Sequence, residues 1–74
     1  MLRLYGRSAC PLCDVMADAL RGLGVAFEKV DVDQRPELAL RYGERVPVLA
    51  DTDGREVCHG RLDTAALHAR LALE

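Results

Sequence analysis

The chain has few large aromatic side chains and no long apolar run. Its 74 residues include no Trp and one Phe, so a core must be built from Leu, Val and Ala and should be of modest stability. No segment approaches the roughly 20 apolar residues that cross a bilayer. Residues 1–5, interrupted by Arg3, are too short for a signal peptide. We therefore expect one domain over residues 1–74, cytoplasmic, without a membrane partner and, by default at this size, monomeric.

The chain also has no large excess of positive or negative charge. Ten Lys and Arg residues stand against 12 Asp and Glu, a net charge of -2, and no basic stripe stands out. This balance argues against nucleic acid as a partner.

The number of cysteines, three, is odd and excludes a complete disulfide framework within one chain. In a reducing cytoplasm, two closely spaced cysteines are more often catalytic or metal-binding than structural. Cys10 and Cys13, separated by Pro and Leu, are such a pair.

Hydrophobic spacing and turn residues predict an α/β protein. Strands are expected over residues 1–6, 25–32, 46–50 and 55–59, and helices over residues 11–23, 35–42 and 64–73. The first strand–helix–strand unit requires parallel strands, and the turn at residues 51–54 predicts an antiparallel hairpin. A mixed four-stranded sheet with helices on both faces fits this order.

Details of the helices follow from the same patterns. Asp33 and Asp63 are expected N-caps of the second and third helices. Along the first helix, apolar residues at spacings of three and four predict one buried face, made of Leu12, Val15, Met16, Ala19, Leu20 and Leu23.

The Cys-Pro-Leu-Cys segment lies where the first strand passes into the first helix. Only a thiolate attacks a disulfide, and Cys10 at the N-cap faces free backbone N–H groups and the positive end of the helix dipole. Arg7 adds positive charge and Asp14 opposes it, with a net effect that favours the thiolate. Cys13, on the third helical position, is the more buried partner. The pattern predicts that Cys10 attacks a substrate disulfide and that Cys13 resolves the mixed disulfide.

Three segments of the chain resemble the glutaredoxin family. Residues 4–13 look like its active-site strand and loop, residues 45–48 like its Thr-Val-Pro segment, and residues 59–63 like its Gly-Gly-x-x-Asp segment. The resemblance covers nearly the whole chain and is strongest with short bacterial glutaredoxin-like proteins of unassigned function. It implies the thioredoxin fold (βαβαββα) and reduction of protein or low-molecular-weight disulfides. It also implies glutathione as a co-substrate, with no tightly bound cofactor.

The resemblance assigns roles around the cysteines. It implies a cis Val46–Pro47 bond, with the Val46 backbone placed to pair with an extended substrate. Gly60 and Asp63 match positions that hold the amino-acid end of glutathione, and Arg7 matches a basic position near its glycine carboxylate. A plain N-cap at Asp63 and a solvated loop arginine at Arg7 are the alternatives.

Three residues depart from the family pattern. Leu12, a substrate-contact position between the cysteines, replaces an aromatic residue, Arg45 replaces a threonine, and His59 replaces a glycine. These departures leave two electron donors open, glutathione and thioredoxin reductase.

Cys58 and His59 raise further readings. With Cys10 and Cys13 they have the residue types of a zinc or iron–sulfur site. Neighbours on a strand point to opposite faces, however, so a metal is not expected. We therefore expect Cys58 to be a small core residue. His59 is expected to be an exposed residue or a base near Cys13, and His68 a surface residue. A module that docks a protein without turnover is the remaining alternative.

Overall fold

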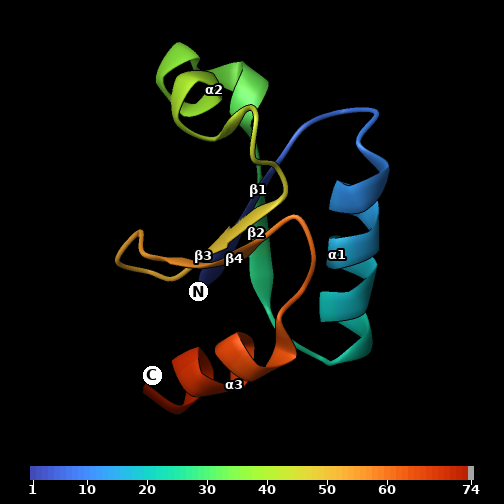
Figure 1. The fold of residues 1–74 in the computed structure, drawn as a ribbon, viewed down its shortest axis with the longest axis vertical. Coiled ribbons are helices and arrows are strands. Elements are labelled where there is room, and N and C mark those ends of the chain that lie inside the picture. Colours follow the sequence, from blue (N-terminus) through green and yellow to red (C-terminus); the bar gives the residue numbers. More distant parts are fainter. Residues whose placement is uncertain (74) are drawn as a thin grey trace.

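A computed structural model describes residues 1–73 (Figure 1). The elements are β1 (Leu2–Gly6), α1 (Pro11–Gly22), β2 (Phe27–Asp31), the 3-10 helix η1 (Val32–Gln34), α2 (Pro36–Tyr42), β3 (Val48–Ala50), β4 (Glu56–His59) and α3 (Thr64–Leu73). The predicted order of strands and helices is confirmed, and all four strands are shorter than predicted.

The four strands form one mixed sheet in the order β2-β1-β3-β4. β1 and β2 are parallel, whereas β1 with β3 and β3 with β4 are antiparallel, as the sequence predicted. Because β3 runs opposite to both neighbours, its beginning meets the ends of β1 and β4. The loops that follow β1, precede β3 and follow β4 therefore share one edge of the sheet.

Helices cover both faces of the sheet (Figure 1). On one face, Leu2 and Leu4 of β1 pack with residues of α1 and α3, including Leu20 and Leu67. On the other face, Tyr5 stacks on Tyr42 of α2, with ring centroids 4.2 Å apart. The alternation of side chains along β1 thus divides the core into two layers.

The predicted buried face of α1 was wrong in part. The buried residues are Cys13, Met16, Ala17 and Leu20, at the spacing of a helical stripe that faces the sheet. Leu12 and Val15 are 48% and 64% exposed, and Leu23 is exposed as well. They flank the stripe, because the sheet contacts only the side of the helix centred on Met16.

The predicted cap at Asp33 was also wrong. Asp33 lies in η1, and α2 begins after Arg35, which makes no side-chain cap hydrogen bond. The Asp33 carboxylate pairs instead with Arg7, 26 residues away in sequence. Asp63, in contrast, accepts a hydrogen bond from the Ala66 N–H at 3.0 Å, so its predicted capping role is confirmed.

The hairpin between β3 and β4 is organised by the buried carboxylate of Asp51. It accepts hydrogen bonds from the N–H groups of Asp53 and Arg55, each at 2.9 Å, and from the Arg70 guanidinium of α3. Burial by itself would raise the pKa of Asp51, but the hydrogen bond from Arg55 and the charge of Arg70 outweigh it and lower the pKa.

We expect Asp51→Asn to lower the unfolding temperature at pH 7 and to flatten its decrease in acid. The folded-state pKa of Asp51 lies below the unfolded value of about 3.9. Its contribution is therefore complete above that value and is lost as the pH falls through the folded pKa. Thermal unfolding followed by circular dichroism at pH 7, 5 and 3 measures the effect. Parallel curves for the two proteins would contradict it.

Candidate redox site

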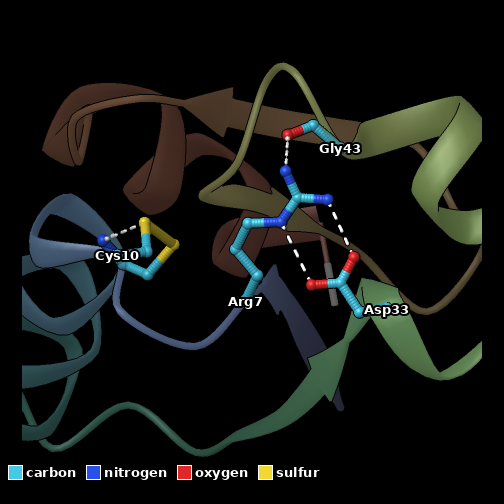
Figure 2. The surroundings of a disulfide bond; sticks show 5 residues. Arg7, Cys10, Asp33 and Gly43 are labelled. Atoms are coloured by element: carbon cyan, nitrogen blue, oxygen red, sulfur yellow. Dashed lines mark hydrogen bonds and ion pairs between the residues drawn. A yellow bond between two sulfur atoms is a disulfide. The ribbon is translucent and has the colours of Figure 1, made fainter.

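Cys10 and Cys13 form a disulfide at the start of α1, with their Cα atoms 5.2 Å apart (Figure 2). Cys10 is the N-cap and Pro11 is the first helical residue. Proline is suited to this position because an N–H group there would have no acceptor within the helix. The Cys10 sulfur accepts a hydrogen bond from the Cys13 N–H at 3.1 Å. The predicted placement of Cys10 at the helix N-terminus is confirmed.

The two sulfur-bearing residues differ in exposure. Cys13 is 6% exposed, whereas Cys10 is half-buried at the end of the loop from β1. Gly6 lies behind Cys13: a β-carbon built there would lie 3.2 Å from the Cys13 sulfur. The site thus offers one accessible cysteine and keeps the second beneath it.

The loop before β3 closes the same edge of the sheet. The Val46–Pro47 peptide bond is cis and Pro47 is buried. The Pro47 carbonyl accepts a hydrogen bond from the Gly60 N–H at 2.8 Å, which ties this loop to the end of β4. Val46 is half-buried and packs against the core layer beneath α2.

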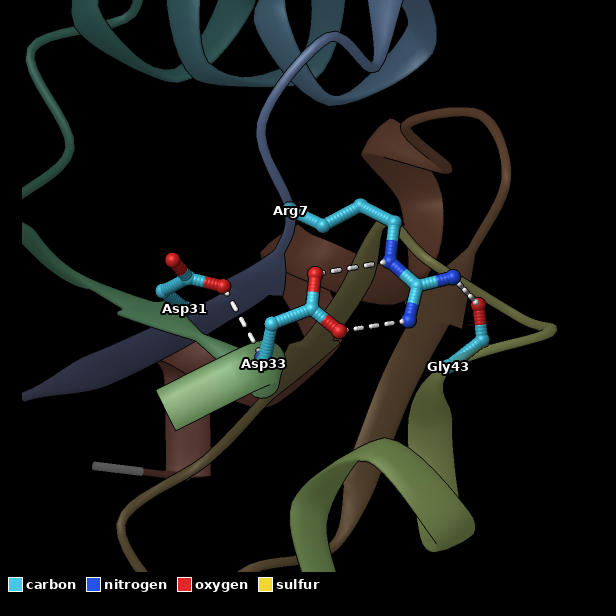
Figure 3. Close-up of polar contacts among 4 residues, drawn as sticks. All are labelled: Arg7, Asp31, Asp33 and Gly43. Atoms are coloured by element: carbon cyan, nitrogen blue, oxygen red, sulfur yellow. Dashed lines mark hydrogen bonds and ion pairs between the residues drawn. The ribbon is translucent and has the colours of Figure 1, made fainter. Parts of the chain in front are cut away.

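Arg7 links the loop that carries Cys10 to the other side of the sheet (Figure 3). Its guanidinium donates to both Asp33 carboxylate oxygens, at 2.9 and 3.3 Å, and to the Gly43 carbonyl at 3.1 Å. A side chain at Gly43 would collide with the Ala39 carbonyl, since its β-carbon would lie 2.4 Å from that oxygen. The three hydrogen bonds hold the Arg7 side chain against Asp33 and Gly43 (Figure 2).

Arg45, in the loop between α2 and β3, also has an acidic partner. Its guanidinium hydrogen-bonds to Glu56, and the other Glu56 oxygen lies 3.0 Å from Nδ1 of His59. Burial by itself would raise the pKa of Glu56, but its hydrogen bonds with His59 and Arg45 outweigh it and lower the pKa. Two of the three residues that depart from the family pattern, Arg45 and His59, therefore share one carboxylate.

The remaining predicted site residues lie on the α1 side. Leu12, together with Val15 and Ala19, lines a groove of about 320 Å³ whose opposite wall is residues 60–62. Gly60 has a φ of +76°, a conformation that favours glycine, and directs its N–H to Pro47. Asp63 immediately precedes α3, and its carboxylate accepts a hydrogen bond from an N–H group of the first turn of that helix.

Cys58 and His59 point to opposite faces of the sheet, as alternation along a strand requires. Cys58 is buried in the core layer of α1 and α3, and His59 is exposed. Burial raises the pKa of the Cys58 thiol. Within residues 1–73 no three His, Cys, Asp or Glu side chains are grouped so that they hold a metal ion. His68 is exposed on α3.

No helix within residues 1–73 is long and apolar enough to span a membrane.

Three features of this region escaped prediction. The pairing of Arg7 with Asp33, and of Arg45 with Glu56, joins residues that are 26 and 11 positions apart. The sequence gives no signal for such partners beyond opposite charge. The groove along Val15 was not predicted, because apolar residues at helical spacing also predict a buried face.

Comparisons with known proteins place this architecture. A family model described as Glutaredoxin-like domain (DUF836) matches residues 1–72. The X-ray structure of the structural genomics target protein XcR50 from X. campestris is 40% identical, covers 100% of this chain and 99% of its own, and has a TM-score of 0.81.

Two further proteins are similar at greater distance. The SPbeta prophage-derived thioredoxin-like protein YosR of Bacillus subtilis (strain 168) is 37% identical over 51 residues, which are 65% of this chain and 64% of YosR. The match therefore spans less than two thirds of that relative. A crystal structure of wheat glutaredoxin, 20% identical, covers 97% of this chain and 76% of its own with a TM-score of 0.65. That likeness confirms the predicted thioredoxin fold.

Proposed function

The chain belongs to the family of glutaredoxin-like domains, and from this membership and its cysteine pair we propose that it is a cytoplasmic dithiol–disulfide oxidoreductase. The observation that carries the proposal is the Cys10–Cys13 disulfide at the N-terminus of α1, with one accessible and one buried cysteine. Its substrates are protein or low-molecular-weight disulfides, and it needs no tightly bound cofactor.

The reaction uses two thiol–disulfide exchanges. The Cys10 thiolate attacks one sulfur of the substrate disulfide, forms a mixed disulfide and releases the other substrate sulfur as a thiolate. The Cys13 thiolate then attacks the Cys10 sulfur, so the Cys10–Cys13 bond forms and the second substrate thiolate leaves. Two electrons pass from the cysteine pair to the substrate, and an external thiol or dithiol restores the pair.

The α1 N-terminus supports the first exchange. An N–H group already directed at the Cys10 sulfur, that of Cys13 at 3.1 Å, stabilises negative charge there when the pair is reduced. The buried position of Cys13 favours attack by Cys10 first, because a substrate disulfide reaches Cys10 without displacing the helix.

Val46 and Pro47 complete the proposed substrate surface. Val46 precedes β3, which begins at Val48, so its backbone lies ahead of the β3 ladder. We assign it the pairing of an extended substrate segment, in the manner of an added strand. Pro47, buried beside it, fixes the direction of that segment.

Reduction of insulin disulfides by dithiothreitol, followed by turbidity, tests the proposal. The wild-type protein is expected to accelerate the reaction, and Cys58→Ala, altered at a buried cysteine outside the site, is the matched control that retains the acceleration. A wild-type rate equal to that of dithiothreitol alone would contradict the proposed function.

A further inference from the structure

We propose that the Cys10–Cys13 disulfide exchanges with cysteines carried on apolar segments of other proteins, and that small anionic thiols such as glutathione are poor partners. The inference rests on the proposed oxidoreductase function and names its partner class. Two independent observations carry it: the internal pairing of Arg7 and Arg45, and the apolar groove that begins at Leu12, between the two cysteines in the sequence.

The first observation concerns charge. Glutathione carries two carboxylates and one ammonium group, so its recruitment depends on cations with unfilled hydrogen-bond donors. Arg7 already makes three hydrogen bonds, two with Asp33 and one with the Gly43 carbonyl. Only two of the five guanidinium N–H groups lie outside these hydrogen bonds, and a thiol's carboxylate would compete with the Asp33 carboxylate for the positive charge.

Arg45, in the loop before Pro47, is paired in the same way. Glu56 accepts a hydrogen bond from it and also lies against His59. The positive charges of Arg7 and Arg45, in the loops before α1 and before β3, are therefore matched by the protein's own acids. Both arginines therefore connect segments of this protein, and their charge is less available to bind an external anion.

The second observation concerns shape and polarity. Leu12, which lies between the two cysteines, is 48% exposed, and Val15 one turn further along α1 is 64% exposed. With Leu62 on the opposite wall they line the groove of about 320 Å³. Exposed apolar surface next to a reactive group indicates contact with a partner. Glutathione is charged at both ends, so it matches these apolar walls less well than an apolar segment of a protein does.

Arg61 also lines the groove and is exposed. It offers one positive charge beside the apolar walls, which suits an acidic residue on the docking segment. For a small thiol, one exposed ion pair increases the rate by at most about fivefold.

The first test compares small thiols on the oxidised wild-type protein. At equal thiolate concentration, glutathione is expected to reduce the disulfide at a rate within about fivefold of neutral 2-mercaptoethanol, without saturation. A saturable preference for glutathione of more than about tenfold would overturn the proposal.

Asp33→Asn tests the charge argument by weakening the hold on Arg7. We expect it to raise the glutathione rate about three- to tenfold at low salt, and the increase to vanish at about 0.5 M salt because of screening. Asp18→Asn is the matched control, since it removes the same charge from an ion pair with Arg21 two turns along α1. Equal glutathione rates in the two variants would overturn the assigned role of Asp33.

Val15→Ser tests the groove. The ratio of its rate on insulin to its rate on 2-hydroxyethyl disulfide is expected to fall about three- to tenfold relative to wild type. The matched control is Leu40→Ser, at a leucine of α2 that is 90% exposed and lies outside the groove. An unchanged ratio in Val15→Ser would overturn the proposal. Absence of wild-type activity on both disulfides would instead refute the oxidoreductase function itself.

Discussion

Replacing Cys10 by serine is expected to lower the protein-catalysed part of insulin reduction about a thousandfold or more, so that the observed rate equals that of dithiothreitol alone. Cys10 is the accessible member of the pair and the one at the helix N-cap, so its sulfur is the atom that meets the substrate. A serine hydroxyl fills the same place but cannot form a mixed disulfide. The measurement is the turbidity assay with variant and wild type at equal concentration.

The variant must be folded for this result to bear on chemistry. Cys10 lies at the start of α1 rather than in either core layer, so we expect the far-ultraviolet circular dichroism to be unchanged. Neither remaining cysteine substitutes for it, since Cys13 and Cys58 are both buried. A folded Cys10→Ser variant that reduces insulin at half the wild-type rate or more would contradict the assignment of the nucleophile.

Cys13→Ser is expected to stop the reaction after its first step and to accumulate a mixed disulfide on Cys10. In the wild type the Cys13 sulfur lies next to that of Cys10 and resolves the intermediate within the molecule. Without it, release depends on an external thiol, and an intramolecular step is replaced by a bimolecular one. Incubation of the reduced variant with 2-hydroxyethyl disulfide, followed by mass spectrometry of the intact protein, measures the adduct.

Nearly all of the Cys13→Ser protein should carry one mercaptoethanol group, and the wild type under the same conditions almost none. Cys58 does not take the resolving role, because it is buried and its pKa is raised by that burial. Adduct mapped by peptide digestion to Cys58, or an adduct that disappears as fast as in the wild type, would contradict the role of Cys13.

The sequence was sufficient for the architecture because local signals agreed with one another. Pro11 after Cys10 marked the start of α1, the turn at residues 51–54 marked the hairpin, and Asp63 marked the start of α3. Each of these is a short-range effect of backbone geometry or capping. The cysteine pair fell at the predicted junction for the same reason.

The predictions were wrong where contacts between distant residues determine a helix start or the exposure of a side chain. Asp33 has the chemistry of an N-cap, but its carboxylate is engaged by Arg7, and α2 begins at Pro36 without a side-chain cap. Val15 matches the helical apolar spacing, but whether that spacing faces the sheet or a neighbouring loop depends on how α1 is rotated. A local sequence pattern predicts neither the ion-pair partner of a charged residue nor the orientation of a helix against the sheet.

The same division holds for the site. The reacting cysteines lie in one contiguous motif, so they were predicted with their roles. The surroundings that we expect to select the partner involve Glu56 and Leu62, residues of distant segments whose pairing depends on the folded chain. Specificity was therefore less accessible to sequence reasoning than the reaction type.

Selective alkylation tests the central claim most directly, because it identifies the nucleophilic sulfur without a substrate. The fully reduced protein is treated with less than one equivalent of iodoacetamide at pH 7, and the label is located by peptide mapping. We predict that Cys10 is labelled about tenfold or more in excess of Cys13 and Cys58. Equal labelling of the three cysteines, or preferential labelling of Cys13, would contradict the account of Cys10 as the attacking thiolate.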